Sequence, residues 1–109
     1  MKVFKLIPIK EHINDVEWEH CVNIPKYCIV LAENEDKAMK IAQDYNLIAI
    51  ESGKVHRFPL LCKKLIKIED LSETDPSAAK KYLTKLENSA ERCINSKEGF
   101  RRQDVLSSS

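Results

Sequence analysis

The alternation of side chains along the first half of the chain predicts two strands. Residues 27–32 (YCIVLA) form an uncharged run that is rich in β-branched and aromatic residues. A short apolar run of this kind is typical of a strand that is covered on both faces. Residues 2–9 alternate in a similar way and predict a first strand. Because Pro8 has no N–H to donate to a ladder, this strand lies at an edge of the sheet, or it ends at Pro8.

A helical period follows the second strand directly. Asn34 is a suitable N-cap, because its side chain accepts a hydrogen bond from the free backbone N–H groups that follow. Glu35 and Asp36 place negative charge in the first turn, where the helix dipole favours it. Apolar residues then recur on one helical face, at Ala38, Ile41, Ala42 and Tyr45. Residues 47–51 continue this helix or form a strand, and we favour the helix because the first clear stop is Gly53.

Two further elements are predicted in the second half of the chain. Residues 62–69 place Ile66 and Ile68 on one side of a strand whose other face is solvated. Asp75 is a suitable N-cap for a helix that begins at Pro76, where the missing N–H of proline costs nothing. The apolar residues of this helix step by three or four positions, at Ala79, Leu83, Leu86, Ala90 and Cys93. We expect the helix to end at Gly99.

The narrow apolar stripe of this last helix fits two arrangements. The helix packs on its own domain, which we favour, or it pairs with a second copy through a short coiled-coil seam. The candidate residues for self-association are Leu83, Leu86 and Ala90. The chain is thus predicted to be α+β, with a small, mainly antiparallel sheet of three or four strands and two helices. Residues 1–72 form the core, 73–99 the C-terminal amphipathic helix and 100–109 a disordered tail.

Length and composition place the chain among ordinary globular proteins. It has 109 residues, of which 43% are hydrophobic and 32% are charged, so one domain with a modest core is expected. No apolar run approaches the roughly 20 residues of a membrane span, and the N-terminus does not read as a signal peptide. We therefore expect the cytoplasm, where the scattered cysteines remain thiols. The cysteines are Cys21, Cys28, Cys62 and Cys93.

The familiar catalytic and cofactor motifs are absent. The glycines are Gly53 and Gly99, which excludes the glycine-rich loops that cradle phosphates. The nearest approach to a metal site is the set His12, His20, Cys21 and Cys28, whose spacing lacks the paired ligands of zinc sites. Nothing favours Cys62 and His56 as a nucleophile pair over a buried thiol and a surface imidazole. We expect no catalytic residue, metal or cofactor.

Charge and aromatic residues mark two segments for contact with a partner. The basic segment 54–67 contains no acid, whereas residues 11–36 are acidic apart from Lys26. Its candidate contact residues are Lys54, Arg57, Phe58, Lys63, Lys64 and Lys67. Such a segment is most often a solvated face, but it also suits a phosphate backbone, or the acidic segment of the same chain or of a second copy. Trp18 closes one edge of the core or offers an exposed anchor for a partner.

These residues resemble a group of small uncharacterised bacterial proteins. The resemblance consists of the opening strand 2–9, an Asp-x-x-Trp element at Asp15 and Trp18, and a strand that leads into an alanine-rich helix at 32–42. It covers about the first fifty residues. Where those proteins often have a second tryptophan near the basic loop, this chain has Phe58 followed by proline. The resemblance implies an α+β fold and adds no site.

The sequence therefore predicts a non-enzymatic protein-interaction module. We expect it to associate with itself, as a dimer, or with another protein, and not with a membrane. The alternative is an accessory protein that binds nucleic acid through the basic segment 54–67. A third possibility, a redox or metal protein that depends on its cysteines, has the least support from the spacing.

Overall fold

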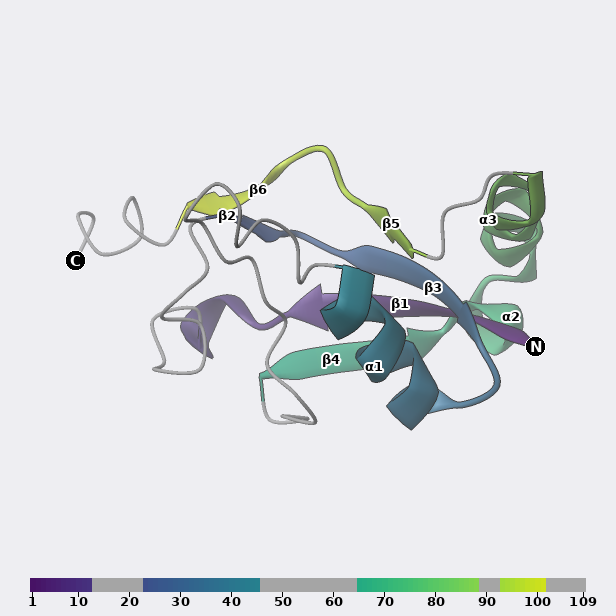
Figure 1. Ribbon diagram of the computed structural model, residues 1–109, viewed down its shortest axis with the longest axis horizontal. Coiled ribbons are helices and arrows are strands. Elements are labelled where there is room, and N and C mark those ends of the chain that lie inside the picture. The colour runs from purple at the N-terminus through teal and green to yellow at the C-terminus, as the bar shows by residue number, and fades with distance from the viewer. Residues whose placement is uncertain (13–22, 46–64, 89–92, 102–109) are drawn as a thin grey trace.

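The structure, a computed structural model, describes residues 1–12, 23–45, 65–88 and 93–101. Its main sheet has four strands in the order β4-β1-β3-β5, and all neighbouring strands are antiparallel (Figure 1). These strands are β1 (Lys2–Pro8), β3 (Cys28–Ala32), β4 (Ile66–Asp70) and β5 (Cys93–Asn95). A second, two-stranded sheet pairs β2 (Asn23–Pro25) with β6 (Gly99–Arg101). The helices are η1 (Lys10–His12), α1 (Glu35–Tyr45), α2 (Leu71–Thr74) and α3 (Pro76–Asn88). The predicted α+β class is confirmed.

The first strand lies inside the sheet and not at its edge. β1 pairs with β3 on one side and with β4 on the other, so the alternative of an edge strand was wrong. Pro8 is the last residue of β1 and lies opposite Ile66, where the missing N–H is tolerated. The next residue resumes the hydrogen bonding, because the Ile9 N–H donates to the Leu65 carbonyl at 2.9 Å. The predicted strand 62–69 is observed as β4, which begins at Ile66.

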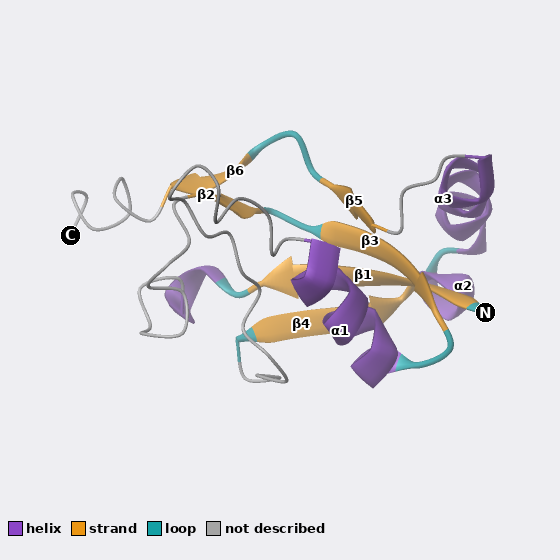
Figure 2. Ribbon diagram, in the orientation of Figure 1, coloured by secondary structure: helices purple, strands orange, loops and turns teal. Residues whose placement is uncertain are grey.

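The two central strands bury both of their faces. Leu6 lies opposite Cys28 and belongs to the core beneath α1, which crosses in front of the sheet in Figure 2. Val3 lies opposite Leu31 and belongs to a second core, which α2 and α3 complete. Because successive side chains point to opposite faces of a strand, β1 and β3 require a layer on each side.

The start of α1 agrees with the sequence. The Lys37 N–H donates to Asn34 Oδ1 at 2.9 Å, as expected of an N-cap. Ala38 and Ala42 are fully buried, and these small side chains let the helix lie close to the sheet. The helix is described as far as Tyr45, so the question of a helix or a strand at 47–51 concerns residues outside the described ranges.

The predicted C-terminal helix was wrong in its extent. The segment 73–99 contains the end of α2, the thirteen residues of α3, and then β5 and the start of β6. Cys93 does not continue the helical stripe, since it pairs with Val30 and is fully buried in the sheet. Gly99 begins a strand, where a Cβ would lie 2.5 Å from the Ile24 carbonyl oxygen. Residues 100 and 101 belong to β6 and not to a tail, and 102–109 lie outside the described residues.

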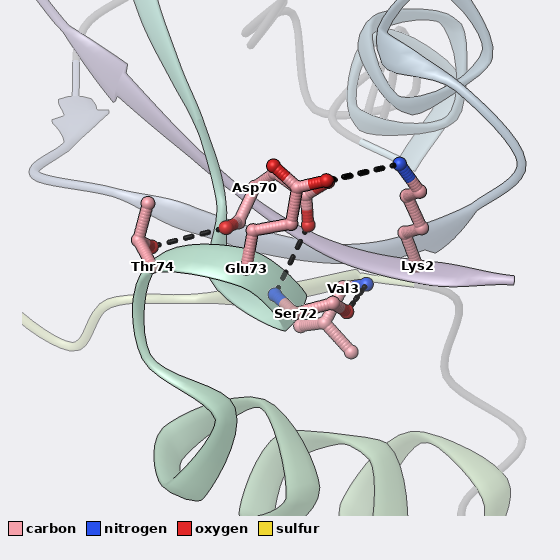
Figure 3. Close-up of polar contacts among 6 residues, drawn as sticks. All are labelled: Lys2, Val3, Asp70, Ser72, Glu73 and Thr74. Carbon is pink, nitrogen blue, oxygen red and sulfur yellow. Dashed lines mark hydrogen bonds and ion pairs between the residues drawn. The ribbon is translucent and has the colours of Figure 1, made fainter.

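A polar junction ties the first strand to the short helix α2 (Figure 3). Asp70, the last residue of β4, caps α2 by accepting the Ser72 N–H at 3.0 Å. The Ser72 hydroxyl in turn accepts the Val3 N–H at 3.0 Å. Lys2 Nζ lies 3.2 Å from Asp70 Oδ2, and this hydrogen bond and charge raise the pKa of Lys2.

The helix α3 packs on its own sheet. Asp75 caps it, because the Ala78 N–H donates to Asp75 Oδ1 at 3.2 Å. Leu86 is 6% exposed, and Leu83 is half-buried against the second core, which includes Val3. Association of two copies through these leucines would compete with the packing inside the chain. Within the described part of the chain, no helix is long and apolar enough to cross a membrane.

Replacing Leu86 by alanine should lower the free energy of unfolding by about 2–5 kcal/mol, because it leaves a cavity between α3 and the sheet. The matched control is Lys80→Ala, an exposed change on the same helix that should stay within about 0.5 kcal/mol of the parent. Urea unfolding measures both. Midpoints that rise with protein concentration, and a Leu86→Ala loss that vanishes on dilution, would place Leu86 in a seam between copies instead.

A candidate partner-binding surface

The structure describes one of the predicted contact residues of the basic segment. Lys67 is exposed on β4, and its Nζ lies 3.3 Å from Glu69 Oε1. It lies opposite Ile7, so it shares a sheet face with Lys5. The other predicted contact residues lie outside the described ranges: Trp18, Lys54, Arg57, Phe58, Lys63, Lys64 and Ala90. His20, Cys21, His56 and Cys62 lie outside them as well.

A broad, open depression of about 410 Å³ lies where α3 faces the beginning of β3 and the link between β5 and β6. We call it the lysine–tyrosine depression. Its lining includes the charged and aromatic residues Lys26, Tyr27, Tyr82, Lys85, Lys97 and Glu98. With three lysines and one glutamate, the described lining of the depression has a positive formal charge.

Hydrogen bonds through Ser96 fix the wall formed by the β5–β6 link. The Tyr27 N–H donates to Ser96 Oγ at 3.2 Å, and the Ser96 N–H donates to the Tyr27 carbonyl at 2.9 Å. The Ser96 hydroxyl donates to the Glu98 carbonyl at 2.7 Å. This ring of bonds holds Lys97 beside the start of β3, although about seventy positions separate the two segments.

Two tyrosines line the depression, one from α3 and one just before β3. Both Tyr27 and Tyr82 are half-buried and pack against the second core. Burial, and then the hydrogen bond and charge of Tyr27, raise the pKa of Tyr82 above its usual value. Lys5 Nζ lies 4.8 Å from the centre of the Tyr27 ring, a cation–π distance. Tyr27 therefore contacts both Tyr82 and Lys5.

The lysines of the depression come from separate parts of the chain. Lys26 precedes β3, Lys85 lies on α3, and Lys97 lies between β5 and β6. Sequence analysis missed this set because the three lysines do not form a cluster in the sequence. The signal in the sequence was weak: Lys26 and Tyr27 lie just before β3, and Lys97 lies shortly after β5. Lys26 and Glu98 form an ion pair at 3.2 Å, although both side chains are well exposed.

The described cysteines lie on the other face of the sheet, in the core beneath α1. Cys28 Sγ donates to Asn95 Oδ1 at 2.7 Å, and Cys93 Sγ approaches the same oxygen at 3.5 Å. Both thiols are fully buried, as expected of cysteines that serve as small apolar residues. Within the described ranges, no group of three His, Cys, Asp or Glu residues is placed to hold a metal ion.

The raised pKa of Tyr82 gives a test of the tyrosine pair. Because the pKa is higher in the folded protein than in the unfolded chain, its contribution to stability is complete below pH about 10. The contribution is lost as the pH rises through the folded pKa. A spectroscopic titration should show a tyrosine that ionises above the usual range, and Tyr82→Phe should remove this step. The control is the same titration in urea, where the step should be missing from both proteins. Persistence of the step in folded Tyr82→Phe would assign it to another tyrosine.

Comparisons of the chain with protein-family models, with curated proteins and with solved structures returned no match. The resemblance noted for the first fifty residues therefore stays a prediction, and the assignment of function depends on the geometry of the described residues.

Proposed function

We propose that the protein is a non-enzymatic interaction module whose protein partner binds the lysine–tyrosine depression. The observation that carries the proposal is the depression itself, whose lining combines two half-buried tyrosines with three lysines from different segments. Tyrosine is among the residues that most often anchor protein interfaces, because it contributes a large, rigid contact area and a hydroxyl group. A broad, open depression also suits a protein surface better than a small ligand, which binds where it can be largely enclosed.

A different protein fits the depression better than a second copy. In a two-fold dimer the same patch faces itself, so Lys85 and Lys97 would approach the lysines of the other copy. Self-association through an apolar patch also has little support, because Met1 is the one exposed large apolar side chain among the residues whose burial the structure describes. Self-association, which the sequence predicted, thus becomes the second outcome of the test.

Nucleic-acid binding is the alternative function, and the position of Lys67 favours it. Lys67 lies on the same sheet face as Lys5, which stacks on Tyr27. A cationic face with an aromatic ring is a common arrangement for single-stranded nucleic acid. Against this, Glu69 pairs with Lys67, and the chain has a net charge of +1. The charge balance gives no general attraction to a polyanion.

The proposal predicts a site-specific crosslink. A photoreactive benzoylphenylalanine in place of exposed Lys97 should yield a covalent adduct with one other protein in cells that produce the chain. The matched control places the same residue at Lys40, which is exposed on α1, and should give no adduct of that mass. Mass spectrometry identifies the product. An adduct at twice the mass of 12.6 kDa would indicate self-association, and an adduct with nucleic acid, or none at Lys97, would contradict the proposal.

A further inference from the structure

The ion pair inside the depression indicates the chemistry of its ligand. Glu98 carries a carboxylate that lies 3.2 Å from Lys26 Nζ, and its side chain is 82% exposed. An exposed pair of this kind contributes little to stability, so it exchanges readily for another partner. The depression thus already holds one carboxylate among its lysines, supplied by its own rim. A carboxylate from outside can take the same place.

The distribution of charge suits a ligand with more than one carboxylate. Lys26 pairs with Glu98, and Lys85 and Lys97 line the same depression with two further lysine side chains. Three lysines at separate points near two tyrosine rings suit a ligand that carries several negative side chains. Between these side chains, such a ligand also needs a surface that contacts the rings. An acidic peptide has this pattern, because its carboxylates extend from a backbone that can lie on the rings.

A nucleic-acid strand fits the same rim less well. Single-strand binders follow the phosphate backbone with a continuous cationic groove, and their affinity grows with the number of phosphates contacted. Among the described residues, Glu98 lies within the depression and Glu69 lies next to Lys67 on the adjoining sheet face. These carboxylates interrupt the cationic surface on both sides of Tyr27. The pattern favours a short ligand with separate negative groups.

We propose that the lysine–tyrosine depression binds an acidic peptide segment of the partner protein, whose carboxylates displace Glu98 from Lys26. This inference rests on the proposed function and adds the chemical class of the partner. Glu98 acts as an internal competitor for the lysines. Changes on the rim should therefore have opposite effects: removing a lysine weakens binding, and removing the Glu98 charge strengthens it.

The test measures, by fluorescence anisotropy, the binding of a fluorescein-labelled ten-residue peptide to the full chain. The peptide has glutamate at every second position. The wild type should bind with saturation, and binding should weaken as salt is added. The double variant Lys85→Glu with Lys97→Glu should weaken binding by about tenfold or more, because it reverses two rim charges. The control double variant Lys10→Glu with Lys40→Glu changes the net charge equally at exposed positions away from the depression, and should stay within about twofold.

Glu98→Gln supplies a second measurement that does not depend on the double variant folding normally. It should tighten binding by roughly two- to fivefold, the range that corresponds to the loss of an exposed ion pair. Its control is Glu35→Gln, an exposed change on α1 that removes the same charge on the other side of the sheet and should have little effect. Circular dichroism and thermal unfolding establish that each variant is folded.

Four results would overturn the inference: no saturable binding by the wild type, an equal loss in the two double variants, an equal gain in the two glutamine variants, or tighter binding of a fifteen-residue oligothymidylate than of the peptide. The crosslinking experiment separates this inference from the proposed function. A protein adduct at Lys97 without peptide binding would reject the acidic peptide and keep the interaction module. The absence of both would reject the two together.

Discussion

The pairing of β1 with β3 is the constraint on which the rest of the structure depends. In the observed register Val3 faces Leu31 and Leu6 faces Cys28, so each strand contributes apolar side chains to both cores. A slip of one residue would exchange the two faces and turn Lys5 toward the core beneath α1. Both faces therefore need a cover: α1 on one, and α2 with α3 on the other. The polar junction at Asp70 secures the second cover to the start of β1.

The candidate site is a consequence of this two-sided arrangement. Tyr27 stands at the point where β3 enters the sheet, and α3 reaches it with Tyr82. The segment after α3 returns to pair with β3 as β5, and Ser96 then binds the backbone of Tyr27 on both its N–H and its carbonyl. The start of β3 thus meets α3 and the segment after β5, which both lie much later in the chain. A surface that such contacts hold in place loses little entropy when a partner binds.

The electrostatics of the molecule are local rather than global. A net charge of +1 steers no partner by itself, but it is compatible with a cationic depression on one side of the sheet and an acidic helix start on the other. The depression keeps its own carboxylate, Glu98, within reach of Lys26. Such an arrangement limits unspecific binding of anions, because a ligand must replace an existing contact. It favours ligands that supply several carboxylates at once.

The sequence by itself determined the elements whose signals are local. Strand alternation located β1, β3 and β4, Asn34 marked the start of α1, and Asp75 with Pro76 marked the start of α3. Only the tertiary structure decided where α3 ends, because Cys93 and Ile94 suit an apolar stripe at helical spacing as well as a buried strand. Their pairing with Val30 and Ile29 settles the choice through contacts more than sixty positions away. The depression was hidden for the same reason: its lysines and tyrosines are scattered in the sequence, and only the folding of the chain brings them together.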